Sequence, residues 1–339
     1  MSTPYNGWAT DISIQREATL GGSGSGAVYS LCGRVRFNQG VEFVGKDKTV
    51  NVWREQAKSF YSGKYYTGTI EIELGLNAVI EILLGIFFEL ESSESVAEGG
   101  AGGIVYGEFG PIFGEGGEIS GEPPSITSYV LRPLRLKGLK SCKIGLDFLS
   151  HSFLLEGVTI DSLRFDIRRN QVPKLNVTFK ALTRESVAVP ALADAASIDV
   201  RRAHHTSVAF TFDAVALSNI TEGNFTFNSI KLPTKFSATK TPELFRVEPF
   251  TLSGQLVEYY SADAKLADAV TDQAEHSLIA ILTDPAGSNR KIEIHWPKLN
   301  FSEGLPEAVN REDLISRASF SGLCDSAQTS DGPKLILVA

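Results

Sequence analysis

The chain has 339 residues, 42% of them hydrophobic, and a net charge of −8. This length and apolar content exclude a disordered chain and suffice for two domains. The 31 glycines and the single methionine favour a turn-rich β protein over a helical bundle, and the acidic balance disfavours tight binding of nucleic-acid phosphates.

Residues 1–27 are polar and end in a Gly-Ser run, which predicts a flexible N-terminal arm. No basic start precedes an apolar run, so we expect no signal peptide. The longest apolar run, near residues 76–90, carries Glu81 and is too short for a membrane span. Three widely spaced cysteines, Cys32, Cys142 and Cys324, are typical of reduced thiols in a protein made in a cytoplasm.

Residues 28–184 predict a first β domain centred on one alternating strand, residues 65–74. Its buried face holds Gly68, Ile70, Ile72 and Leu74, and its solvent face holds Thr67, Thr69, Glu71 and Glu73. From Leu76 to Phe88 the apolar residues recur every three or four positions, which predicts an amphipathic helix. A strand followed by a short helix therefore forms the centre of this domain.

The remaining elements complete two units of similar order. A Gly- and Glu-rich loop over 92–124 is followed by strands at 126–136, 142–149, 158–167 and 174–180. Residues 185–206 predict a linker, and residues 207–323 predict a second β domain. Some local helix or strand within the linker is possible. In the second domain a strand at 250–260 leads into a helix at 262–274, then into a hairpin and a last strand at 310–322, followed by a C-terminal extension at 324–339.

The two domains share their element order, which predicts an internal duplication. In each, an upstream extended segment leads to a strand with Thr and Gly near its middle, then to a short helix, a hairpin and one more strand. The alternative is that two similar β-rich domains arose by chance.

Charge is concentrated in one segment of the chain. From Tyr65 to Leu131 there are eleven Glu and no Lys, Arg or Asp. Such a segment repels phosphates over about a Debye length, ~8 Å at physiological salt. We therefore expect it to supply an acidic wall.

The order of three motifs resembles the tail tube proteins of long-tailed bacteriophages: TGTIEIELGLNAVIEILLG, FLLEGVTIDSLRFDIRRNQVPKLNVTFKAL and FTLSGQLVEYYSADAKLADAV. The resemblance covers roughly residues 28–323 and implies a β-sandwich or partial barrel with flanking helices. It also implies a virion protein whose subunits close into rings that stack into a hollow tube. DNA would pass through this tube without specific binding, and a tape-measure protein and a tail terminator would be partners.

Known tubes of this family have six domains per ring, so a duplicated chain implies three copies with pseudo-sixfold symmetry, favoured over six copies. On this reading Glu71 and Glu73 line the lumen, with Glu258 in a comparable place in the second domain. We expect no membrane contact and a location in the phage tail.

Other functions find less support in the sequence. A terminator or decoration protein of the virion remains an alternative, as does a carbohydrate-active β-sandwich, because paired Glu residues suit glycoside hydrolysis. However, exposed carboxylates are the normal state of Glu on a strand face. His204 and His205 lack neighbours at metal-ligand spacing, and no GxSxG motif occurs. We therefore expect no catalytic, metal or cofactor residues.

Overall fold

A computed structural model provides the structure of the chain. It describes residues 8–44, 60–75, 78–96, 126–133, 140–148, 151–188, 191–192, 196–197, 208–217, 219–236, 242–248, 250–259, 265–272, 274–284, 290–303, 306–308, 314–322 and 333–338. Most of the expected 92–124 loop and of the expected linker lie outside these residues. So do the connections that lead into the second helix and the last two strands.

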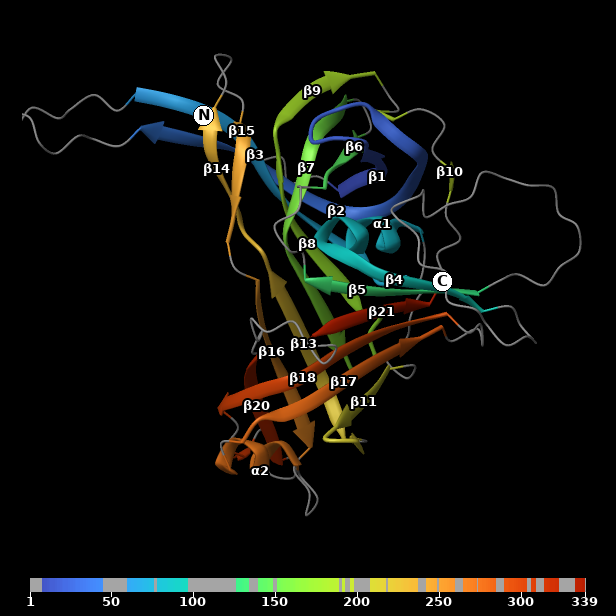
Figure 1. Cartoon of the computed structure of the whole chain (residues 1–339), viewed down its shortest axis with the longest axis vertical. Helices are drawn as coiled ribbons and strands as arrows, with labels where there is room; N and C mark the ends of the chain where they lie inside the picture. The colour runs from blue at the N-terminus through green and yellow to red at the C-terminus, as the bar shows by residue number, and fades with distance from the viewer. Residues whose placement is uncertain are drawn as a thin grey trace, which may run out of the picture.

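The protein is mainly β, as the sequence predicted, with two short helices (Figure 1). The helices are α1 (Ala78–Phe87) and α2 (Lys265–Asp272). The strands are β1 (Trp8–Glu17), β2 (Gly24–Val44), β3 (Phe60–Glu73), β4 (Phe88–Val96), β5 (Ile126–Pro133), β6 (Cys142–Phe148), β7 (His151–Arg168), β8 (Lys174–Ala181), β9 (Thr183–Val187), β10 (Ala196–Ser197), β11 (Val208–Phe212), β12 (Val215–Leu217), β13 (Ile220–Asn228), β14 (Lys231–Phe236), β15 (Pro242–Val247), β16 (Thr251–Tyr259), β17 (His276–Thr283), β18 (Lys291–Glu303), β19 (Pro306–Ala308), β20 (Leu314–Gly322) and β21 (Lys334–Val338).

One continuous antiparallel sheet, here called the long sheet, crosses both halves of the chain. Its strands follow in the order β2, β3, β8, β7, β13, β16 and β20, and the end of β18 with β19 completes it. The two halves meet where β7 pairs with β13 over seven positions, from Arg168 opposite Glu222 to Ser162 opposite Asn228. The halves are therefore not separate sandwiches joined by a linker.

A second set of strands joins the halves on the other side of the core. β21 pairs with β18 of the second half and with β5 of the first, and β5 also pairs with β4. The C-terminal extension expected from the sequence is thus partly a strand of this layer (Figure 1). It connects two hairpins that are far apart in the sequence.

The core lies between these layers and is continuous across the junction. α1 is almost wholly apolar, and its side chains Ile80, Ile82, Leu83, Leu84 and Phe87 are at most 1% exposed. Phe88, which follows it, contacts Phe227 of β13 edge to face, with ring centroids 5.4 Å apart. Phe165 of β7 also contacts Phe227 edge to face, with ring centroids 6.0 Å apart. Because burial of large aromatic surface is strongly favourable, this packing holds the halves together.

The order of strand pairing occurs twice along the chain. In the first half β1 pairs with β6, β2 with β3, β3 with β8, and β8 with β7. In the second half β11 pairs with β17, β13 with β16, β16 with β20, and β20 with the end of β18. Each half carries its helix after the third of these strands, α1 after β3 and α2 after β16. The first half has an additional hairpin, β4–β5.

Residue identities repeat with the pairing. Phe37 of β2 is opposite Gly68 of β3, which is opposite Phe179 of β8. In the second half the corresponding positions are again aromatic, glycine and aromatic: Phe225, Gly254 and Phe320. The hairpins that continue these strands, β2–β3 and β14–β15, extend to the same end of the molecule and contact each other (Figure 1).

Two expectations from the sequence were wrong. The N-terminal arm is not wholly flexible, because residues 8–17 form β1, whose Ile12 and Ile14 are 0% and 1% exposed. The first domain accordingly begins before residue 28. Residues 92–96 belong to β4 rather than to a loop. Residues 185–187, at the start of the expected linker, belong to β9, which pairs with β7. In β1 and β9, polar composition concealed short strands that are fixed by long-range pairing.

Candidate functional site: the polar face of the long sheet

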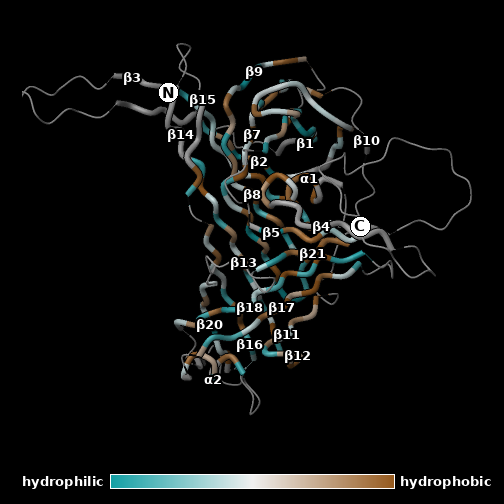
Figure 2. The backbone as a smooth tube through the Cα atoms, in the orientation of Figure 1, coloured by the Kyte–Doolittle hydropathy of each residue, from teal (hydrophilic) through white to brown (hydrophobic). Residues whose placement is uncertain are grey.

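The long sheet has one buried face and one polar face. Along β3 the residues Tyr66, Gly68, Ile70 and Ile72 are buried, whereas Thr67, Thr69, Glu71 and Glu73 are exposed or half-buried, as the sequence predicted. Figure 2 shows hydrophobic and hydrophilic residues alternating along the neighbouring strands β7, β8 and β13. Alternation of period two therefore runs through the centre of the sheet.

Charged and polar residues from both halves share the polar face. They are Arg34 and Arg36 of β2, Glu71 and Glu73 of β3, Lys174 and Asn176 of β8, Arg164, Asp166 and Arg168 of β7, Glu222 and Asn224 of β13, Gln255 of β16, and Arg317 and Ser319 of β20. Six of these residues are basic and four are acidic, so the described face is mixed in charge. The expected acidic wall does not form here, because pairing places cationic strands on both sides of β3.

Glu71 makes the clearest ionic contact on this face. Its Oε1 lies 2.8 Å from Lys174 Nζ, and this hydrogen bond holds the pKa of Glu71 below its usual value. Asp166 accepts hydrogen bonds from Arg164 Nε at 2.8 Å and from Asn176 Nδ2 at 2.7 Å. Since Glu71 and Lys174 are 32% and 46% exposed, solvent screening leaves this ion pair little net stability.

Glu73 lies on the same face as Glu71, opposite Lys174 in the register of β3 and β8. Its side chain is exposed. A shallow cavity on this face is lined by Glu71, Asp166, Arg168, Gln171, Val172, Lys174 and Asn176. The two residues that we expected to act together are therefore neighbours, but among cations rather than in an acidic cluster.

Glu258 does not share this face. It is 1% exposed, and its Oε2 accepts a hydrogen bond from Leu266 N at the start of α2, at 3.3 Å. Burial raises the pKa of its carboxyl. The repeated register explains the error: Gly254 corresponds to Gly68, so Glu258 corresponds to Ile72 and points inward. A shift of one residue reverses the face of a strand.

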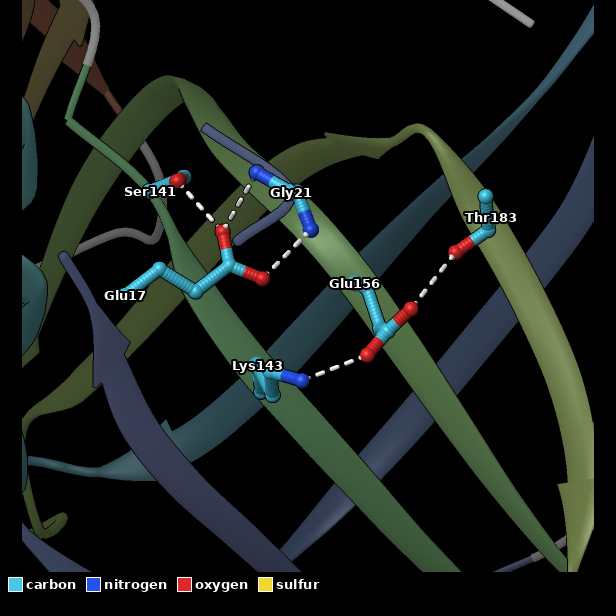
Figure 3. A network of polar contacts seen from close by, with 7 residues as sticks. Glu17, Gly21, Ser141, Lys143, Glu156 and Thr183 are labelled. Atoms are coloured by element: carbon cyan, nitrogen blue, oxygen red, sulfur yellow. Dashed lines mark hydrogen bonds and ion pairs between the residues drawn. The ribbon is translucent and has the colours of Figure 1, made fainter. Parts of the chain in front are cut away.

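Two carboxylates drawn in Figure 3, those of Glu17 and Glu156, have structural roles. Glu17 accepts hydrogen bonds from Ser141 Oγ at 2.5 Å, Gly21 N at 3.0 Å and Gly157 N at 2.8 Å. Glu156 lies 2.5 Å from Lys143 Nζ and accepts from Thr183 Oγ1 at 3.3 Å. Because these oxygens are engaged by partners at the starts of β6 and β9, in β7 and in the β1–β2 turn, the two groups fix strand ends.

Other reactive groups have similar structural surroundings. Cys142 is buried, and burial raises the pKa of its thiol. His276 Nδ1 lies 2.7 Å from Asp213 Oδ2, and its ring stacks on Phe212. Within the described ranges no group of three or more His, Cys, Asp or Glu residues could hold a metal ion. Neither α1 nor α2 has the length and apolarity that crossing a bilayer requires.

The geometry thus defines a β-rich protein whose most extensive feature is a sheet that runs through both halves of the chain. A family model for the phage tail tube protein matches residues 45–322, most of the chain. The chain therefore belongs to the phage tail tube protein family, a family of virion structural proteins of the tail, as the sequence resemblance indicated. No curated protein matches the chain.

Proposed function

We propose that this protein is the major subunit of a tail tube, that three copies close into a ring with pseudo-sixfold symmetry, and that rings stack into a hollow conduit for DNA. On this proposal the chain is not an enzyme, and its partners are further copies, a tape-measure protein and a tail terminator. Family membership supports the tail location.

The observation that carries the threefold ring is the repeat of pairing and residues. The Phe37–Gly68–Phe179 and Phe225–Gly254–Phe320 rows support a duplication of one unit within the chain. Two such units placed side by side by the β7–β13 pairing give one third of a six-unit ring. The contact between the β2–β3 and β14–β15 hairpins at one end of the molecule also fits units related by rotation about a common axis.

We further propose that the polar face lines the lumen, with Glu71 and Glu73 on it. The ion pairs of this face support that assignment. A cation already engaged by a carboxylate, as Lys174 is by Glu71, releases fewer counterions from passing DNA than a free one would. Ion pairing of this kind therefore weakens the hold of the wall on passing DNA.

Electron microscopy and native mass spectrometry of the purified protein test this function. We expect hollow tubes, together with a smallest closed ring of three times the chain mass of 36.7 kDa. A ring of six chains would overturn the threefold arrangement but keep the tube. Particles that cap tube ends or coat capsids, without forming tubes themselves, would instead indicate a terminator or a decoration protein.

A further inference from the structure

The long sheet has two edge strands: β2 at one end of the strand order, and the end of β18 with β19 at the other. In the described part of the chain, β2 beyond Arg34 pairs only with β3, and β19 pairs only with β20. β18 pairs with β17 as far as Leu299, and the same side of the strand carries no further partner among the described residues. Unpaired strand edges are templates for pairing with another strand.

The junction inside the chain provides a model for how two such edges join. β13 corresponds to β2, because Phe225 corresponds to Phe37, and β13 has its outer edge occupied by β7. β7 corresponds to β18 and β19. In each of the two segments the register shifts directly after the residue that lies opposite the last phenylalanine of the row. In β7 this residue is Ile160, opposite Phe179, and in β18 it is Phe301, opposite Phe320.

The correspondence fixes a register. Phe165 of β7 lies opposite Leu175, four residues before Phe179, and Pro306 of β19 lies opposite Ser316, four residues before Phe320. Pro306 therefore takes the place of Phe165, and Glu307 takes the place of Asp166. Inside the chain Asp166 is opposite Asn224, whose counterpart in β2 is Arg36.

We propose that β2 of one chain pairs antiparallel with the β18–β19 edge of a second copy, with Arg36 opposite Glu307 of the partner subunit. This proposal rests on the proposed ring and names the strands and register that close it. The charges are complementary: the β2 edge carries Arg36, and the other edge carries Glu303 and Glu307. Opposite charges directly across two strands favour one register and oppose slipped ones.

Charge reversal tests the pairing. With three such contacts in each ring, we expect Arg36→Glu and Glu307→Arg each to lower the yield of rings or tubes by about tenfold or more, because like charges then face each other. The double variant should restore assembly. Arg164→Glu is the matched control, since Arg164 lies on the same face but β7 is paired on both sides.

Disulfide trapping tests the register directly. Arg36→Cys combined with Glu307→Cys should give a covalent closed trimer on oxidation, because residues directly opposite in adjacent strands lie within disulfide range. Either single variant should not, and Arg36→Cys with Glu303→Cys should crosslink far less. The register would be overturned, and the tube function left intact, by the following combined result: the wild type forms rings, the reversal variants assemble normally, and the cysteine pair does not crosslink. Failure of the wild type to form any ring would overturn both.

Discussion

Phe179 of β8 lies directly against Gly68 of β3, so closely that a Cβ atom added at Gly68 would come within 2.5 Å of Phe179 Cζ. The same added atom would lie 2.7 Å from the carbonyl oxygen of Arg36. In the second half, a Cβ at Gly254 would overlap Phe320 and the carbonyl oxygen of Asn224 in the same way. Each glycine thus permits an aromatic ring to lie flat across the neighbouring strand.

Gly68→Ala is therefore expected to lower the free energy of unfolding by about 1–3 kcal/mol, the usual range for overpacking a close-packed site. Phe179→Leu should recover part of this loss in the double variant, because a smaller side chain leaves room for the methyl group. Thr69→Ala, one residue along on the polar face, serves as the control. Urea unfolding measures all four proteins, and a neutral effect of Gly68→Ala would contradict the close contact.

A second prediction concerns a buried charge cluster where the halves meet. Lys231, which is 3% exposed, donates its Nζ to the carbonyl oxygen of Ile160, and its backbone N–H donates to Asp161 Oδ1 at 3.0 Å. Lys180 Nζ lies 2.8 Å from Asp161 Oδ2 and 2.6 Å from the carbonyl oxygen of Lys231. Burial lowers the pKa of Lys231 to about 8.

Because the pKa of Lys231 is lower in the folded state than in the unfolded state, unfolding takes up a proton between about pH 8 and pH 10.5. The wild type should therefore gain stability as the pH rises through this window, by up to about 3 kcal/mol. Lys231→Met should lack this gain, and Lys298→Met, at an exposed position, should retain it. Parallel pH profiles of wild type and Lys231→Met in urea unfolding would show that the charge is not buried.

The third prediction uses Glu258, whose buried carboxylate accepts a hydrogen bond from the first turn of α2. Its pKa is raised, so folding takes up a proton between the ordinary and the raised value, and stability should increase as the pH falls through the folded pKa. Glu258→Gln keeps an acceptor but should lose this pH dependence. Glu258→Ala should destabilise the protein by about 1–2 kcal/mol through loss of the cap.

Glu275→Gln, an exposed carboxylate beyond the end of α2, is the control for that measurement. Thermal unfolding at several pH values between about 4 and 7 compares the variants. If Glu258→Gln followed the wild-type profile, the raised pKa would be excluded as a source of the pH dependence.

The fourth prediction concerns DNA passage. Glu71→Lys with Glu73→Lys should leave the fold and the tube intact, because both side chains lie on the polar face and the Glu71–Lys174 pair is partly exposed. The added cations should bind DNA phosphates and impair ejection. Infectivity after complementation with the variant subunit is the measurement. The Glu71→Gln and Glu73→Gln double variant separates the loss of two negative charges from the gain of two positive ones. Normal infectivity of the Lys variant would remove these residues from the lumen.

The sequence predicted the parts of the fold that depend on local periodicity. The alternation along β3 and the apolar stripe of α1 identified the strand, its buried face and the helix, because both patterns lie within one segment. By contrast, β1 is polar overall, and its assignment depends on pairing with β2 and β6. Such long-range pairing leaves no local signal.

The candidate site was predicted less completely for the same reason. Residues 65–131 are acidic in sequence, but a sheet places residues from different segments beside one another, and Arg36 and Lys174 come from strands outside that segment. The sequence placed Glu258 on the wrong face of its strand, because Thr and Gly near the strand centre do not determine which residues point inward. The Phe-Gly-Phe rows would have fixed it, but only once the strands were paired.

The pairing of β21 with both β5 and β18 determines the order in which the molecule can be completed. During synthesis β5 leaves the ribosome long before residues 334–338 exist, so the edge of β5 that pairs with β21 has no such partner until those residues have been made. Only then do the two halves become locked on the side away from the long sheet. The layer that contains β21 is therefore completed last, after every strand of the long sheet has been synthesised.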